Sequence, residues 1–335
     1  MFKKIVTVLV VIIALLVIVY FLGPHPASPD YTLEMPAVPS EAKALENYIS
    51  SNESLRKIKP DNEARIIWAD SARHKTEYSI VYLHGFSASQ EEGDPVHTDI
   101  AKKYGCNLYL SRLAEHGIDT TEPMYNITPE KYWASAKQAL AIGEQLGNKV
   151  ILMGTSTGGT NALQLAAAFP DKIFALLLFS PNIAINNDKA WLLNNPWGLQ
   201  IAKAVQGSDH VTAKDQRDIY KKYWYSRYPL KAASELQELL ETTMTKETFS
   251  NVKQPTLLLY YFKDEQHQDA VVSVSAMLKM FDQIATPDSL KRKYAVPNAG
   301  DHVIGSYIKS KDVQTVEAYT NAFMQQVLHI SEKRN

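Results

Sequence analysis

The sequence predicts an α/β fold, with a mostly parallel central sheet flanked by helices, on three observations. Short apolar runs alternate with longer amphipathic stretches after the first 60 residues, as expected when buried strands alternate with helices. The 335 residues are 45% hydrophobic and 21% charged, which excludes a disordered or low-complexity protein. No repeat of about 20 to 50 residues is visible, which argues against a solenoid or a propeller. We therefore expect one α/β core that carries an insertion.

The first expected element is an N-terminal transmembrane helix. Residues 5–22 carry no charge, and a helix of these 18 residues spans roughly 27 Å, close to the thickness of a bilayer core. A cleaved signal peptide is the alternative, but its apolar region has only about 7 to 15 residues, and residues 20–24 make a poor cleavage site. Lys3 and Lys4 precede the span, so the positive-inside rule places the N-terminus in the cytoplasm and the rest outside it, in the periplasm if the host is bacterial. Residues 1–23 are thus predicted to be the uncleaved signal anchor of a single-pass membrane protein.

A proline-rich tether is expected next. The stretch 24–40 is rich in prolines, which favour an extended chain without regular structure. They are Pro24, Pro26, Pro29, Pro36 and Pro39. We assign residues 24–60 to this tether and the entry into the fold, and residues 61–333 to the folded domain.

Seven short apolar runs within the domain are strand candidates. They cover residues 66–69, 78–83, 107–110, 149–153, 173–179, 256–261 and 293–296. Helix candidates lie between them, and the clearest, residues 129–146, has Thr128 to cap its start and Gly147 to end it. Residues 160–168 and 313–329 show a similar pattern.

One interval breaks this alternation. Residues 182–254 contain no convincing strand, and we expect a helical lid inserted at about residues 186–230. The interval is rich in aromatic side chains, which are Trp191, Trp197, Tyr220, Tyr223, Trp224, Tyr225 and Tyr228. Large apolar side chains line both cores and pockets, so these residues either pack the lid onto the body or form an apolar wall over a substrate.

The clearest chemical motif is Gly154-Thr155-Ser156-Thr157-Gly158, between a predicted strand and a predicted helix. This G-x-S-x-G pattern in that context is typical of a nucleophile elbow, a turn too tight for side chains at the glycines. Ser156 is the candidate nucleophile, projected at the N-terminus of the helix. A phosphate-binding loop is disfavoured because Thr160 stands where the essential lysine would be.

A second motif, His84-Gly85-Phe86, follows the predicted strand at 78–83. We expect the backbone N–H groups of Phe86 and Thr157 to form an oxyanion hole, where each donor is typically worth around 3 kcal/mol. His84 is expected to hold the loop rather than to react.

The general base and its partner should follow the serine in the chain. His302 comes just after the last predicted strand and is the candidate base. For the orienting carboxylate, Asp264, Glu265 and Asp269 compete after the strand at 256–261. We favour Asp269, because Asp269-Ala270-Val271-Val272 resembles the D-x-V-V sequence that leads into the next helix in enzymes with this order of motifs, although Asp264 lies nearer the strand end.

Charge and composition limit the possible partners. The 35 Lys and Arg residues almost balance the 36 Asp and Glu residues, so the net charge of −1 gives no field to attract nucleic acid. Cys106 is the only cysteine, which excludes an intrachain disulfide and a thiolate metal cluster. No H-E-x-x-H or clustered Cys and His spacing indicates a metal. The oligomeric state is left open.

Taken together, these motifs resemble the α/β-hydrolase family, in particular its lidded carboxylesterase and monoacylglycerol-lipase-like branch, over residues 64–330. They are His84-Gly85-Phe86, Arg112-Leu113-x-x-His116-Gly117, Gly154 to Gly158, Asp269 and His302. The resemblance implies a serine hydrolase without a cofactor, cleaving a small-molecule or lipid-like ester through a Ser-His-Asp triad and an acyl-enzyme. A peptidase or thioesterase with the same triad, or an inactive membrane-tethered binding protein, are the alternatives.

Overall fold

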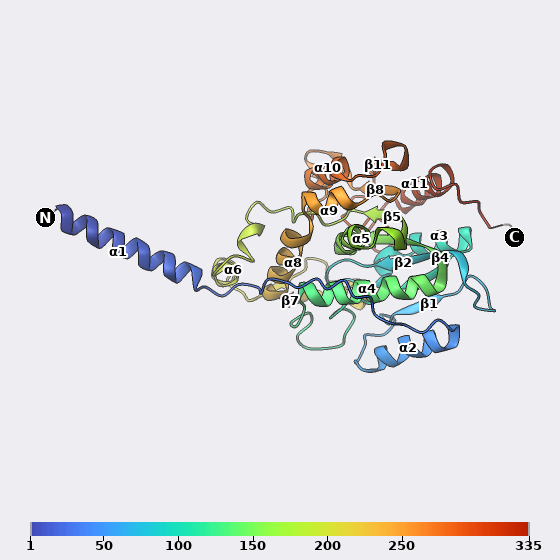
Figure 1. Cartoon of the computed structure of the whole chain (residues 1–335), viewed down its shortest axis with the longest axis horizontal. Helices are drawn as coiled ribbons and strands as arrows, with labels where there is room; N and C mark the ends of the chain where they lie inside the picture. Colours follow the sequence, from blue (N-terminus) through green and yellow to red (C-terminus); the bar gives the residue numbers. More distant parts are fainter. Residues whose placement is uncertain (1, 334–335) are drawn as a thin grey trace.

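The computed structural model describes residues 2–333, with a seven-stranded sheet at the centre (Figure 1). The strand order is β1-β3-β2-β4-β5-β8-β11, and all neighbouring strands run parallel except β1 and β3. The strands are β1 (Arg65–Ile67), β2 (Thr76–Leu83), β3 (Asn107–Leu110), β4 (Gly147–Thr155), β5 (Ile173–Phe179), β8 (Thr256–Tyr260) and β11 (Lys291–Ala295). The mostly parallel sheet predicted from the sequence is confirmed, and each of its seven strands ends within two residues of the predicted bounds.

Helices cover both faces of this sheet because successive side chains of each strand point to opposite faces. On β2, Val81 and Leu83 join one hydrophobic core, while Ile80 and Tyr82 join the other. The first core is closed by α4 (Pro129–Leu146), α5 (Thr157–Ala168), α8 (Leu230–Thr243), α9 (Lys246–Asn251) and α10 (Val274–Gln283). The second is closed by α3 (Val96–Tyr104) and α11 (Val313–Gln326).

The helix predicted at 129–146 has those bounds, and its start shows why. Thr128 Oγ1 accepts the N–H of Lys131, and Pro129 occupies the first helical position, where no amide hydrogen is needed. Its end differs from the expectation, because Gly147 is extended and already begins β4. A side chain at Gly147 would overlap the backbone of Ser79 on the neighbouring strand.

The N-terminal helix α1 (Phe2–Phe21) projects away from the rest of the molecule (Figure 1). Its apolar window has a mean hydropathy of 3.0 and none of its residues is buried, so the helix is long and apolar enough to cross a membrane.

The predicted tether is extended but is not free. Lys137 Nζ donates to the carbonyl oxygens of Thr32 and Glu34, both at 2.7 Å, and Tyr31 and Met35 pack against the first core. The tether is followed by a helix that the sequence analysis did not identify, α2 (Ala42–Ser54). It begins at the cap residue Glu41 and lies against the edge strand β1.

The expectation that residues 182–254 hold no strand is wrong. Two short antiparallel strands, β6 (His210–Thr212) and β7 (Arg227–Pro229), pair within it, with His210 opposite Pro229. Strands of three mixed residues carry too little periodicity to be recognised in a sequence. The same interval contains α6 (Gly198–Gln206) and α7 (Asp218–Tyr223), and a small hairpin, β9 (Phe262–Asp264) with β10 (His267–Gln268), follows β8.

Candidate active site

Ser156 lies in a tight turn between β4 and α5. Its backbone has φ 53° and ψ −121°, a conformation that residues with a side chain rarely adopt. The turn needs its glycines, because a Cβ at Gly158 would overlap the carbonyl oxygen of Leu83 at the end of β2. The geometry is that of the predicted nucleophile elbow, and it places Ser156 at the wall of a large cavity.

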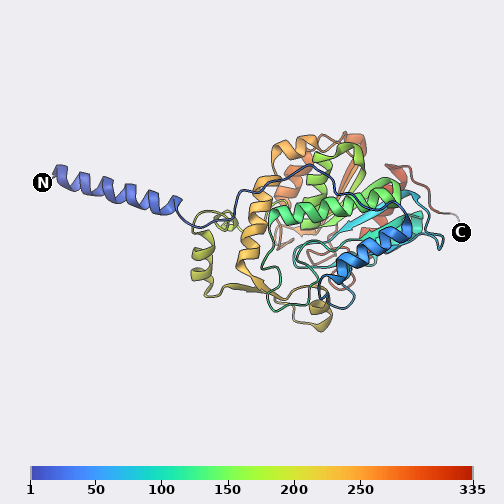
Figure 2. The same cartoon turned by 60° about the horizontal axis from the view of Figure 1, so that its bottom comes forward.

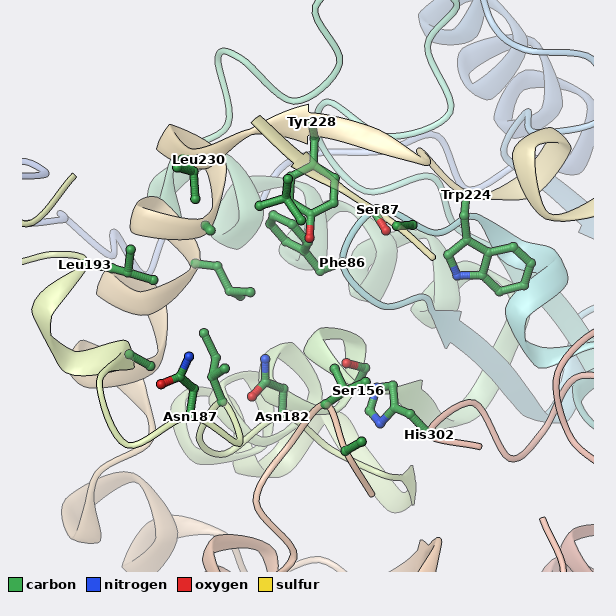
Figure 3. A pocket seen from close by; sticks show the side chains of 18 of the residues that line it. Phe86, Ser87, Ser156, Asn182, Asn187, Leu193, Trp224, Tyr228, Leu230 and His302 are labelled. Atoms are coloured by element: carbon green, nitrogen blue, oxygen red, sulfur yellow. The ribbon is translucent and has the colours of Figure 1, made fainter. Parts of the chain in front are cut away.

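His302 lies at the same wall and pairs with Asp269, which is fully buried behind the cavity lining. His302 Nδ1 donates to Asp269 Oδ2 at 2.6 Å, and Asp269 Oδ1 accepts the N–H groups of Val271 and Val272 at 2.8 and 3.0 Å. Figure 3 shows the His302 ring beside Ser156. Within residues 2–333, His302 Nε2 is buried and has no hydrogen-bond partner, so the nitrogen that would accept a proton is unused.

The electrostatics of this pair are mutually reinforcing. Burial alone would raise the pKa of Asp269, but the charge and hydrogen bond of His302 and the two valine amides outweigh it and hold that pKa below its ordinary value. Burial lowers the pKa of His302, but the charge and hydrogen bond of Asp269 outweigh it, and the net pKa is raised. Asp269 is therefore an ionised carboxylate that orients the ring and stabilises its charged form.

The competing carboxylate, Asp264, is not near His302. It lies exposed in the β9–β10 hairpin, where its Oδ1 accepts a hydrogen bond from His267 Nδ1 at 2.8 Å. Asp301, next to His302, closes its own turn through Val303 N and pairs with Lys309 at 3.1 Å.

The loop after β2 passes beside Ser156, because a Cβ at Gly85 would lie against the Ser156 side chain. Phe86 N–H has no hydrogen-bond partner within the described chain, and Thr157 is the first residue of α5, where no helical carbonyl can accept its N–H. His84 is fully buried and holds the loop, with Nδ1 bonded to Gly85 O and Nε2 accepting the N–H of Leu113. Burial lowers its pKa to about 4, so it stays neutral, as expected for a structural histidine.

His116 and Arg112 also support this loop. His116 Nε2 accepts the N–H of Ser87 at 3.1 Å, and Arg112 donates to His116 O and binds both carboxylate oxygens of Glu53 on α2. These residues act on the position of the loop and do not line the cavity.

Glu92 is a buried carboxyl group that the sequence analysis missed. It belongs to a short 3₁₀ helix (Gln90–Gly93), accepts the N–H of Gly85 and lines the cavity together with Ser156 and His302. Burial raises its pKa to about 7, and its negative charge is one of those that raise the pKa of His302. The only signal in the sequence is its nearness to His84-Gly85-Phe86, because an acidic residue in a loop is ordinarily exposed.

The cavity has a volume of about 820 Å³, within the range of small-molecule sites. Figure 3 shows Ser156 and His302 at one side, facing Phe86 and Tyr228 across the cavity, with Leu193 and Leu230 farther along. Three of the seven aromatic residues singled out in the interval line it, namely Tyr220, Trp224 and Tyr228. Within residues 2–333, no cluster of three or more His, Cys, Asp or Glu residues could hold a metal ion.

No protein-family model matches the sequence, and no curated protein matches it. Solved structures do match. A structure described with LipS and LipT, two metagenome-derived lipolytic enzymes, superposes with a TM-score of 0.64 at 18% identity, over 80% of this chain and 99% of that chain. Monoacylglycerol lipase from Paleococcus ferrophilus gives 0.52 at 15% identity over 76% and 98%, and Est1E from Butyrivibrio proteoclasticus with bound ferulic acid gives 0.52 at 16% over 79% and 95%.

At these identities, the similarity establishes the fold and leaves the reaction to the chemistry of the site. The parallel sheet with helices on both faces and the serine turn after β4 agree with it. The chain therefore has the α/β-hydrolase fold that its motifs predicted.

Proposed function

We propose that this protein is a serine hydrolase of carboxylic esters that α1 anchors in a membrane. The observation that carries the proposal is the buried hydrogen bond between His302 and Asp269 at the wall of the cavity that also exposes Ser156. A serine on a strained turn, a histidine with a free nitrogen and a carboxylate behind it are the parts of a nucleophilic triad.

In the proposed reaction, His302 Nε2 accepts the Ser156 proton while Ser156 Oγ attacks the ester carbonyl carbon. The N–H groups of Phe86 and Thr157 stabilise the oxyanion of the tetrahedral intermediate. His302 then gives its proton to the leaving alcohol as the ester C–O bond breaks. A water molecule attacks the acyl-enzyme, with His302 again as the base, and releases the acid and free Ser156. Asp269 stays ionised throughout.

The cavity favours an apolar acyl group. Leu193 and Leu230 lie along the cavity away from His302 (Figure 3), and Leu236 and Tyr228 also line it. The similar structures are described as lipolytic enzymes, a monoacylglycerol lipase and an esterase-type protein holding ferulic acid, which agrees with an ester substrate. We propose that the substrate is a small-molecule or lipid-like ester. Faster cleavage of peptides or thioesters than of esters would make the protein a peptidase or a thioesterase instead.

Labelling with a fluorophosphonate probe tests the proposal without presuming a substrate. The full chain in detergent is expected to react, and Ser156→Ala and His302→Ala are expected to lose nearly all labelling. Ser289→Ala and His74→Ala, which change exposed residues, are matched controls. A folded wild type that does not label would contradict the hydrolase proposal and favour a binding protein. If the chain labels, an ester panel graded by acyl length, beside peptides and thioesters, gives the substrate class.

We further propose that residues 186–230 act as a lid over the cavity and that α1 is an uncleaved anchor with its N-terminus in the cytoplasm. Lys3 and Lys4 before the apolar stretch support this orientation. Protease added to bacterial spheroplasts, whose inner membrane is closed, should digest the domain. Protection of the domain until the membrane is opened would reverse the assigned topology.

A further inference from the structure

The end of the anchor helix is held by the interval proposed as the lid. Trp197, directly before α6, donates from Nε1 to the carbonyl oxygen of Val19 at 2.9 Å and from its backbone N to that of Pro24 at 3.1 Å. Gly23 lies so close to the Trp197 indole that a Cβ there would overlap the ring. Figures 1 and 2 both show α6 beside the end of α1. These contacts hold the start of α6 against the C-terminal end of α1.

Although α6 packs against α8, two of its apolar side chains stay largely exposed. Ile201 and Val205, one helical turn apart, are 50% and 84% exposed, and both line the cavity. Trp191, just before this helix, is 55% exposed. Apolar side chains that gather at an open rim mark a surface that binds another apolar phase. The cavity thus opens at the end of the molecule where α1 leaves it.

The charges around this rim suit a lipid surface. Residues 189–208 contain two lysines, Lys189 and Lys203, and no acidic residue, although the exposed Asp188 and Asp209 flank this stretch directly. Lysines beside exposed apolar residues are the composition with which interfacial segments meet anionic headgroups. Because Trp197 contacts Val19 near the end of the apolar helix, α6 lies at the level where a bilayer around α1 would end.

We propose that Ile201 and Val205 at the cavity, together with the exposed Trp191, dock on the bilayer that holds α1, so that an acyl chain passes from the lipid phase into the cavity toward Ser156. The docking stands on the contacts of α1 and α6, and the passage of substrate rests on the proposed ester hydrolysis. The substrate class is then an ester dissolved in the membrane itself.

The depth of a spin label tests the docking. Cys106 is buried, so Val205→Cys and the control Gln326→Cys, at the end of α11, offer single labelling sites in the full chain. In liposomes of phosphatidylcholine and phosphatidylglycerol, the label at residue 205 should collide more with oxygen than with a water-soluble nickel chelate, and the label at 326 should do the reverse. Equal exposure of both labels to the chelate would overturn the docking.

A decoupling variant tests the route of the substrate. Trp197→Asn removes the indole contacts, and asparagine tolerates the φ of 64° at this position. Hydrolysis of p-nitrophenyl palmitate carried in the liposomes should fall about tenfold or more as the effective concentration at the mouth is lost, while hydrolysis of soluble p-nitrophenyl acetate stays unchanged. A similar change on both esters, or on neither, would contradict entry from the bilayer. If neither ester were cleaved by the wild type, the hydrolase proposal would fail, and the label depths would still decide the docking.

Discussion

Ser156 and His302 could be proposed from the sequence because the position of each depends on local chain geometry. The glycines around Ser156 indicate a turn too tight for other residues. His302 follows the last strand of a parallel sheet, and functional loops usually lie at the carboxyl ends of such strands. Asp269 could not be separated from Asp264 by spacing, since the β9–β10 hairpin turns one of them toward solvent. Glu92 could not be found at all, because its burial depends on how the loop after β2 folds against Tyr82.

Exchange of the two aspartates distinguishes their roles. Asp269→Asn should lower kcat by about 10⁴, because the amide no longer holds the imidazole in the right tautomer or stabilises its charge. Asp264→Asn should leave kcat close to that of the wild type, since it loses only an exposed contact with His267. Steady-state kinetics on a soluble ester checks both variants, and a large loss in Asp264→Asn alone would reverse the assignment.

The pH dependence follows from the raised pKa of His302. A protonated imidazole cannot accept the Ser156 proton, so kcat/KM should rise with pH through a pKa above that of a free histidine. Glu92→Gln removes one of the charges that raise this pKa, and the acidic limb of the profile should move to lower pH. Glu265→Gln, in the distant hairpin, should leave the limb in place. A profile that does not respond to Glu92→Gln would show that this carboxyl does not act on His302.

At the scale of elements, four neighbouring parallel strands determine the site. β4, β5, β8 and β11 lie side by side in chain order, and the loops after β4, β8 and β11 carry Ser156, Asp269 and His302 to one edge. Continuous apolar runs made β4, β5 and β8 predictable, whereas β11 is apolar only toward its end. The strands β6 and β7 were missed because three residues, some of them polar, are too few to show a strand periodicity.

The close approach of β2 and α5 gives a stability prediction. Gly158→Ala places a methyl group against the Leu83 carbonyl, and backbone cannot move as a side chain can, so the free energy of unfolding should fall by more than about 3 kcal/mol. Gly305→Ala is the control, because its nearest neighbour would be the Phe179 ring at 3.4 Å, an ordinary contact. It should stay within about 1 kcal/mol of the wild type. Urea unfolding measures both, and equal stabilities would mean that the elbow tolerates a side chain.

At the scale of the whole molecule, residues 30–38 of the tether, called the strap here, bind α4 and so connect α1 firmly to the folded domain. The prolines predict an extended chain, but composition alone could not show that α4 binds it. That binding depends on Lys137 and Trp133, which both donate to Thr32 O from positions about a hundred residues away.

Release of the strap should be measurable. Lys137→Met keeps the length of the side chain but removes its bonds to Thr32 and Glu34, and the unfolding free energy should fall by about 1 to 3 kcal/mol. Limited proteolysis should then cleave within residues 24–40 faster than in the wild type. Lys279→Met, on the exposed side of α10, is the matched control. A strap that stays resistant in Lys137→Met would show that the apolar contacts of Tyr31 and Met35 hold it alone.

The order of the strands also has a consequence for biosynthesis. The chain is made from its N-terminus, so α1 and the Ser156 turn exist well before β11 and the loop that carries His302. Each of the strands β5, β8 and β11 finds its partner already made when it appears. The proposed triad is complete only when nine-tenths of the chain has been synthesised. If the chain acts as proposed, it is therefore inert toward esters around it until its translation is nearly finished.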